Sequence, residues 1–204
     1  MAYEHQVFIS YNRDRLWESW LRKLFLPTFR DLLSEEFPPL ASVFFDNDLT
    51  IGDVYWPPAL ATAAANSSVL VPLFTNRYFF SEWCTAELAH FTAREEACGY
   101  RTIARPRTLV LPIILSGGQY FPASINGYTK LDLSEYANPY LNTESDKAQR
   151  LYDAIRGWAP SVFRAVSDAP PYESAWTTLA WQTFQQTYKQ TAPTTIELPN
   201  LGAA

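Results

Sequence analysis

The sequence contains neither a long basic stretch nor a long apolar one. Its formal net charge is −5, and its longest run of lysine and arginine is the pair Arg22 and Lys23. It therefore lacks the positive surface that nucleic-acid-binding proteins use. No apolar run approaches the ~20 residues that cross a bilayer, and the first residues lack the basic and apolar regions of a secretory leader. We expect no nucleic-acid partner, no membrane partner and no export.

Cysteine and histidine are scarce, with two of each. Cys84 and Cys98 fall in one predicted helix, 98 − 84 = 14 residues apart. That spacing corresponds to roughly 20 Å along a helix, whereas a disulfide joins Cα atoms within about 7 Å. Two free thiols are typical of the cytoplasm. With His5 distant from His90, which we place on the helix surface, there is no zinc pattern, and we predict no metal and no resident cofactor.

Three ligand-binding loop motifs are also absent. The chain has no GxGxxG and no GxxxxGK[ST], so neither the dinucleotide fingerprint nor the phosphate loop is present, and residues 116–119 predict a turn. The acidic stretch that begins at Asp46 resembles a calcium loop, but Gly52 stands at its seventh position and Pro57 at its twelfth. A calcium loop requires glycine at the sixth position and glutamate at the twelfth.

Short apolar runs alternate with segments of helical period. Hydrophobic residues make up 48% of the 204-residue chain, enough for one packed domain. Continuous apolar runs predict strands buried on both faces, and their alternation with helices predicts an open parallel α/β sheet with helices on both faces. The predicted strands are 6–10, 42–45, 68–74, 108–115 and, more weakly, 128–133; the predicted helices are 14–35, 56–66, 81–98 and 143–158.

Three prolines interrupt these segments. Pro72 and Pro112 lie inside two predicted strands, and because proline donates no ladder hydrogen bond, each indicates a strand end, a bulge or an edge. Pro27 interrupts the first predicted helix, which should kink or restart there.

Ligands of such sheets bind beyond the carboxyl ends of the strands. The segments that follow the first three strands are 10–14, 46–53 and 75–88. In the last of these, Trp83 and Glu87 are four residues apart and share one face of a helix. Ser81 is a suitable N-cap for that helix, and an indole beside a carboxylate offers a stacking surface for an aromatic ring. Alternatively, Trp83 belongs to the core and Glu87 to the solvated surface.

The motifs in these segments resemble a known family. "FISY" (8–11), D-x-x-L-x-x-G from Asp46 to Gly52, and "SEWCTAEL" (81–88) together resemble the Toll/interleukin-1 receptor (TIR) domain. The resemblance covers roughly residues 5 to 158. It implies a flavodoxin-like sheet of five parallel strands, which agrees with the alternation of elements above.

The resemblance also implies a function and a site. Some TIR domains are enzymes that cleave the nicotinamide–ribose bond of NAD⁺, and their catalytic glutamate follows a tryptophan or a similar residue by four positions, as Glu87 follows Trp83 here. NAD⁺ would be a substrate and not a cofactor. By the same resemblance, the substrate-binding candidates are Ser10, Tyr11, Arg13, Phe45, Asp46, Trp56 and Trp83.

Other interpretations of these candidates remain open. Tyr11 is equally suited to pack beneath a loop, and Arg13 with Asp14 to form a charge pair at a helix start. Phe45, Asp46 and Trp56 flank the loop after the second strand, which in the family closes over substrate and touches neighbouring subunits. A solvated loop held by aromatic packing is the alternative.

Two functions follow from the resemblance. One is an NAD⁺ nucleosidase that acts in immunity, as an antiviral effector or as the source of a nucleotide signal. The other is an adaptor without turnover that works through contacts between TIR domains. Nucleoside deoxyribosyl transfer, which uses a similar fold and a glutamate, is a more distant alternative. In either TIR role the resemblance implies self-association.

The C-terminal part of the chain lies beyond the resemblance. Residues 170–190 place Trp176, Leu179, Ala180, Phe184 and Tyr188 on one side of a helix, which predicts docking onto the domain. We therefore divide the chain into a TIR domain (1–158), a helical extension packed on it (159–190) and a flexible tail (191–204).

Overall fold

A computed structural model describes residues 2–38, 42–45 and 56–191, without the side chains of Trp56 and of residues 188–191. Its centre is a sheet of five parallel strands in the order β2-β1-β3-β4-β5. The strands are β1 (His5–Tyr11), β2 (Val43–Phe45), β3 (Ser67–Phe74), β4 (Ile113–Ile114) and β5 (Leu131–Asp132). This is the flavodoxin-like strand order, so the predicted fold class is confirmed.

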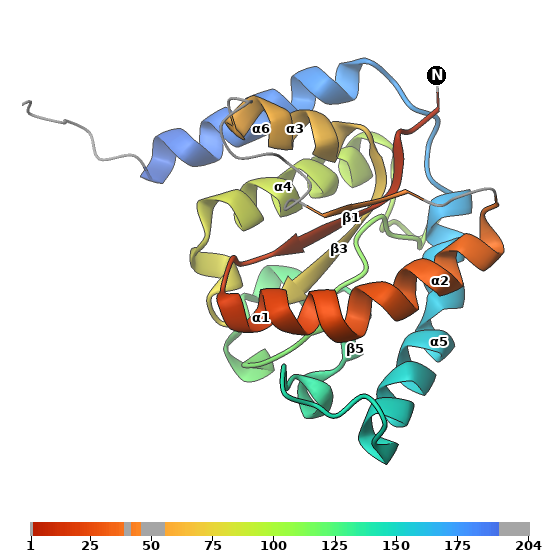
Figure 1. The fold of residues 1–204 in the computed structure, drawn as a ribbon. Coiled ribbons are helices and arrows are strands. Elements are labelled where there is room, and N and C mark those ends of the chain that lie inside the picture. Colours follow the sequence, from red (N-terminus) through yellow and green to blue (C-terminus); the bar gives the residue numbers. More distant parts are fainter. Residues whose placement is uncertain (1, 39–41, 46–55, 192–204) are drawn as a thin grey trace, which may run out of the picture.

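Helices cover both faces of the sheet (Figure 1). On one face lie α1 (Arg15–Trp20), α2 (Leu26–Glu36) and α5 (Asp146–Ser167). On the other lie α3 (Trp56–Ala65) and α4 (Glu82–Ala97), against which α6 (Ala175–Thr191) packs. Short 3-10 turns lie at Tyr78–Phe80, Gly118–Tyr120, Ala123–Ile125 and Ser134–Tyr136.

The first predicted helix consists of three segments. A π-helical turn, Leu21–Phe25, separates α1 from α2, and Pro27 lies in the first turn of α2. A proline is tolerated there because the first backbone N–H groups of a helix have no partner within the helix. The predicted restart at Pro27 is confirmed.

Pro72 differs from the prediction, because it lies inside β3, a central strand. The β3–β4 ladder is interrupted between the bridge Leu70–Val110 and the pair Leu73–Ile113, and both Pro72 and Pro112 fall in that interruption. Pro112 directly precedes β4, as a strand-end proline should. Because β3 and β4 are not paired at this point, the missing N–H group of Pro72 leaves no ladder hydrogen bond unmade, and the proline can lie in the middle of a sheet.

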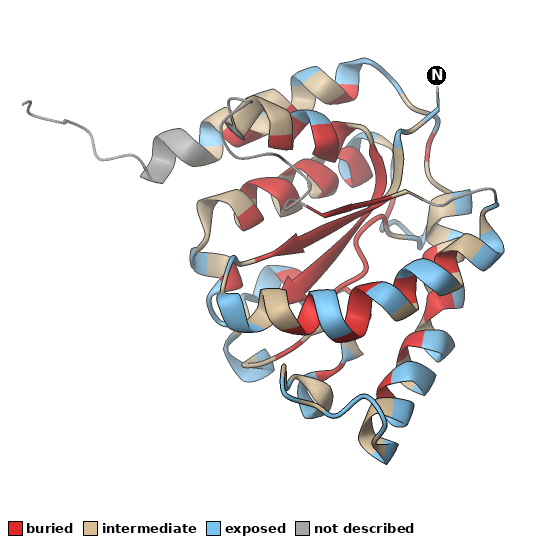
Figure 2. Cartoon of the chain, viewed as in Figure 1, coloured by how far each residue is buried: buried red, intermediate tan, exposed pale blue. Residues whose placement is uncertain are grey.

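The core lies on both faces of β1 and β3 (Figure 2). Every residue of β3 is buried, and so are the last five residues of β1. This continuous burial is the reason that the two strands appear in the sequence as apolar runs without alternation.

The C-terminal helices extend further than the predicted domain boundary. α5 continues through Pro160 to Ser167, so residue 158 lies inside a helix and does not separate two units. Its buried residues Leu151, Ile155, Ala159 and Val162 keep a helical spacing across that point. On α6, Trp176, Ala180 and Phe184 are buried against α3 and α4, as the predicted apolar face requires.

Candidate functional site

The candidate site lies where α4 begins, beyond the carboxyl ends of β1 and β3. In this strand order the chain reverses its direction of winding between β1 and β3, the place where such sheets bind ligands. Ser81 caps the helix: its side-chain oxygen accepts from the backbone N–H of Cys84 at 3.4 Å, and its carbonyl accepts from that of Thr85 at 3.0 Å. The cap fixes the start of α4 and therefore the direction in which the next turns face.

Glu87 is a buried carboxylate in the second turn of α4. It is only 4% exposed, and its Oε2 atom accepts a short hydrogen bond from the hydroxyl of Ser10 at the end of β1. A buried carboxylate is costly unless hydrogen bonds replace its hydration. The interpretation of Glu87 as solvated surface is therefore wrong, and Ser10 contacts Glu87 directly.

A third side chain completes this network. The phenol oxygen of Tyr78 lies 2.8 Å from the Ser10 hydroxyl and donates to the Cys84 carbonyl at 3.1 Å. Burial raises the pKa of Tyr78 well above its usual value, with smaller contributions from Cys84 and Glu87. Sequence reasoning missed Tyr78, although a tyrosine between a buried strand and a helix cap needs a partner for its hydroxyl when it is buried.

A pocket of about 180 Å³ opens above Glu87. Four of the residues predicted for the site lie in its wall: Tyr11, Arg13, Trp83 and Glu87. Among the described residues, Asn12, Leu60, Ser81 and Cys84 also line it. The structure therefore brings together the segment after β1 and the first turns of α4, which are distant in the sequence.

Two of the predicted residues that the structure describes are not in this wall: Ser10, which contacts Glu87, and Phe45. Phe45 is buried beneath the site, where its ring stacks on Tyr11 with centroids 5.0 Å apart. Asp46 lies outside the described residues, and so does the side chain of Trp56, the first residue of α3.

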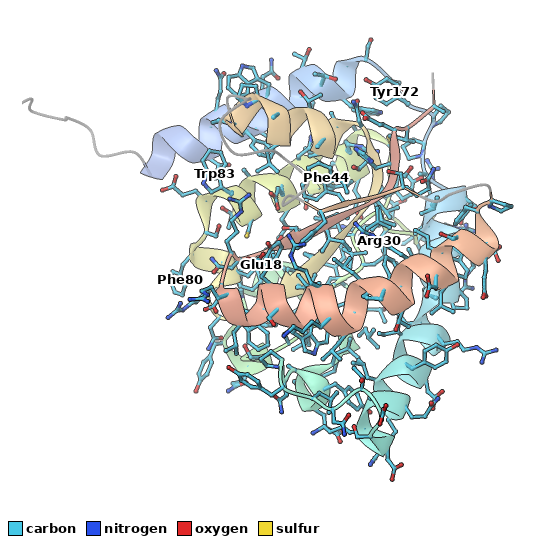
Figure 3. The ribbon with its side chains drawn as sticks, in the orientation of Figure 1. Glu18, Arg30, Phe44, Phe80, Trp83 and Tyr172 are labelled. Carbon is cyan, nitrogen blue, oxygen red and sulfur yellow. The ribbon has the colours of Figure 1, made fainter. Side chains whose placement is uncertain are left out.

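Two aromatic side chains lie near the start of α4, and one of them, Trp83, lines the pocket. Trp83 is half-buried, whereas Phe80 in the preceding 3-10 turn is 88% exposed. Figure 3 shows both on the same edge of the molecule. Arg77 in the same segment pairs with Asp14, the N-cap of α1, at 3.2 Å, which joins the loops that follow β1 and β3.

His90 is buried and not on the surface, so that prediction was wrong. Its exposure is 0%, and in the described part of the chain neither ring nitrogen has a hydrogen-bond partner. Burial, reinforced by the Arg94 guanidinium, lowers its pKa to about 3. Helix α6 packs on α4 and covers a side of it that would face solvent in a domain ending at α5.

The described residues hold no group of three or more histidine, cysteine or acidic side chains arranged to bind a metal. Within the same part of the chain, no helix is long and apolar enough to span a membrane.

Comparison with known proteins agrees with this architecture. The sequence profile described as TIR domain matches residues 7–152. Among solved structures, the chain is similar to the TIR domain of the Toll-related receptor TRR-2 of Hydra magnipapillata, with a TM-score of 0.48 and 14% identity over 74% of this chain and 98% of that one. It is also similar to the TIR domains in the activated Roq1 resistosome that recognises the pathogen effector XopQ, with a TM-score of 0.39 and 18% identity over 92% of this chain and 99% of that one. Because the profile spans well over half of the sequence, the chain belongs to the TIR domain family.

Proposed function

We propose that this protein is an NAD⁺ nucleosidase that cleaves the bond between nicotinamide and ribose, with Glu87 as its catalytic residue. The observation that carries the proposal is a buried carboxylate, held by Ser10, in the wall of a pocket at the reversal point of the sheet. A glutamate that served only solubility would lie on the outer face of α4.

The reaction needs only one carboxylate. A glycosidase that acts on a sugar ether protonates a poor leaving group with a second carboxyl group, whereas nicotinamide is bound to ribose as a cationic ring. When the C–N bond breaks, its electron pair neutralises that ring, and nicotinamide leaves without an added proton. The ribose becomes an oxocarbenium ion, which a preorganised carboxylate stabilises electrostatically while it accepts hydrogen bonds from ribose hydroxyls.

The second half of the reaction requires a nucleophile. If water attacks the ribosyl cation, the water loses one proton, which Glu87 is placed to accept, and the product is ADP-ribose. If a nitrogen of the adenine attacks, the product is cyclic. The choice depends on the shape of the complete pocket.

The remaining pocket residues have supporting roles in this proposal. Trp83 provides a flat surface for the nicotinamide or adenine ring, and Arg13 provides a charge for a phosphate. The described pocket of about 180 Å³ is smaller than the roughly 300–1,000 Å³ of sites that enclose a drug-sized ligand. We infer that it holds one end of the dinucleotide and that a self-associated copy of the chain supplies further walls.

We assign this activity to an immune role in the cytoplasm, as an antiviral effector or as the source of a nucleotide signal. NAD⁺ is available in that compartment, and Cys84 and Cys98 remain free thiols there.

The test is chromatography of NAD⁺ and its products with the purified chain at high concentration, beside Glu87→Gln. Glu96→Gln is the matched control, since Glu96 lies on the same helix and is exposed. We expect wild type and Glu96→Gln to release nicotinamide, and Glu87→Gln to lose at least about a hundredfold in rate, the usual contribution of a preorganised electrostatic group. Equal turnover by Glu87→Gln would refute the assignment.

An absence of turnover in every sample, including samples crowded into assemblies, would favour the alternative. The chain would then act as an adaptor that recruits other TIR domains, and the search would turn to a protein partner.

A further inference from the structure

We propose that Tyr78 is a positioning residue that sets the geometry and charge of the Glu87 carboxylate through Ser10. This inference rests on the proposed function and adds a residue that does not itself meet the substrate. Tyr78 is fully buried and is absent from the pocket wall.

The proton count fixes the direction of the hydrogen bonds. A serine hydroxyl carries one proton, and an ionised carboxylate carries none. Because Ser10 gives its proton to Glu87 Oε2, Ser10 must be the acceptor in its 2.8 Å contact with Tyr78. The phenol also carries a single proton, which is therefore shared between the Ser10 oxygen at 2.8 Å and the Cys84 carbonyl at 3.1 Å, while the Ser10 hydroxyl donates to the carboxylate.

The state of Tyr78 keeps this direction constant. Its raised pKa means that the phenol stays protonated throughout the range in which enzymes work. A donor that never loses its proton polarises the Ser10 hydroxyl and strengthens the bond to the carboxylate. This hydrogen bond replaces part of the hydration that the buried Glu87 carboxylate has lost, which suits the carboxylate to the ribosyl cation of the proposed reaction.

The same hydroxyl joins three segments that are distant in the sequence. It contacts Ser10 at the end of β1 and the Cys84 carbonyl in the first turn of α4, while its own backbone lies in the turn after β3. The ring is held edge-on against Phe74 and Phe79, with centroids 4.9 and 5.3 Å away. Tyr78 therefore fixes the orientation of α4, and with it the position of Glu87, relative to the sheet.

Titratable groups in several described elements lie near Glu87. On α4 itself Cys84 lies one turn before it and His90 one turn after it, and Tyr11 and Arg13 line the same pocket. The packed elements α3 and β3 contain no titratable side chain at all.

Tyr78→Phe removes the hydroxyl and keeps the ring, which makes it the direct test. Tyr128→Phe is the matched control: Tyr128 is also buried, and its hydroxyl donates at 2.9 Å to another buried carboxylate, Glu95, which lies eight residues after Glu87 on α4. Both variants lose one buried phenolic hydroxyl that donates to a hydrogen-bonded network.

Two measurements are made on each variant. The first is the pH dependence of kcat and KM for NAD⁺ cleavage. For Tyr78→Phe we expect kcat to fall about tenfold with KM within about twofold, because one hydrogen bond that acts on the carboxylate is lost. The acid limb of the kcat profile should move up by about one pH unit. Tyr128→Phe should leave kcat, KM and the acid limb of the kcat profile unchanged.

The second measurement does not need turnover. Carbon-13 labelling of the glutamate carboxyls, with the Glu87 signal identified by its absence in Glu87→Gln, reports the pKa of Glu87 directly by NMR titration. A higher pKa in Tyr78→Phe than in wild type and Tyr128→Phe supports the positioning role, even if the protein cleaves no NAD⁺ and the proposed function fails. An unchanged pKa, with kcat unchanged or lowered only as much as in Tyr128→Phe, overturns it.

Discussion

The burial of His90 predicts a dependence of stability on pH that a single substitution should remove. The side chain has a pKa of about 3 in the folded protein, compared with about 6.5 in an unfolded chain. Below about pH 6.5 the imidazole of His90 is protonated in the unfolded state but stays neutral in the folded state, so folding becomes less favourable as the pH falls. The charged groups nearby on α4 are Arg94, which adds to the effect, and Glu87.

The size of the effect follows from the two pKa values. At pH 5 the unfolded histidine is almost fully protonated while the folded one is neutral. The difference of about 1.5 pH units between pH 5 and the unfolded pKa corresponds to roughly 2 kcal/mol of lost stability relative to pH 8. For a domain of this size, that is a decrease of roughly 4–8 °C in melting temperature.

His90→Leu should abolish this contribution. The variant removes two buried nitrogens that have no partner in the described structure, so we expect it to match or exceed wild-type stability at pH 8. Urea unfolding should show that, from pH 8 to pH 5, the free energy of unfolding of His90→Leu falls by about 2 kcal/mol less than that of wild type. Phe91→Leu, which places a leucine at the adjacent buried position, should lower the free energy of unfolding by similar amounts at pH 8 and at pH 5. Equal losses in wild type and His90→Leu would refute the buried neutral histidine.

Two further predictions concern the far end of α4. Glu95 is fully buried and accepts hydrogen bonds from the backbone N–H groups of Leu109 and Val110, so Glu95→Ala should cost about 3 kcal/mol in urea unfolding; a loss below about 1 kcal/mol would contradict the network. Trp176 is buried and carries the Arg94 guanidinium 5.5 Å from its ring. Trp176→Ala should cost about 3–5 kcal/mol and expose α6 to limited proteolysis, whereas an intact α6 would show that other contacts hold it.

The sequence predicted the sheet well because parallel strands buried on both faces have a pattern of their own. Four apolar runs and one weaker segment became β1 to β5 in the order expected for this topology. The prediction was less accurate where tertiary contacts override local rules. Pro72 occupies a central strand because the β3–β4 ladder is interrupted there. Helix α5 passes through Pro160 because its buried face continues to Val162.

The candidate site was predictable where it depends on helix geometry. Four-residue spacing placed Trp83 and Glu87 in the wall of one pocket, and the N-cap at Ser81 is confirmed. Burial was not predictable in the same way, since it depends on what packs against a helix from elsewhere in the chain. Tyr78 and His90 were missed or misplaced for this reason. The apolar side of residues 170–190 predicts that this helix docks on the domain, but it does not indicate which side of α4 it covers.

His90 and Glu87 are both buried on α4, but within the described structure they differ in whether they have hydrogen-bond partners. His90 is surrounded without polar partners and stays neutral, whereas Glu87, one turn earlier, is surrounded but receives the Ser10 hydrogen bond. A buried carboxylate that is supplied with donors keeps its charge, and a charge held out of water acts more strongly on a cation than one in solvent. In the proposed reaction, the hydrogen bonds from Tyr78 through Ser10 to Glu87 would suit a glutamate within a folded core to stabilise a ribosyl cation.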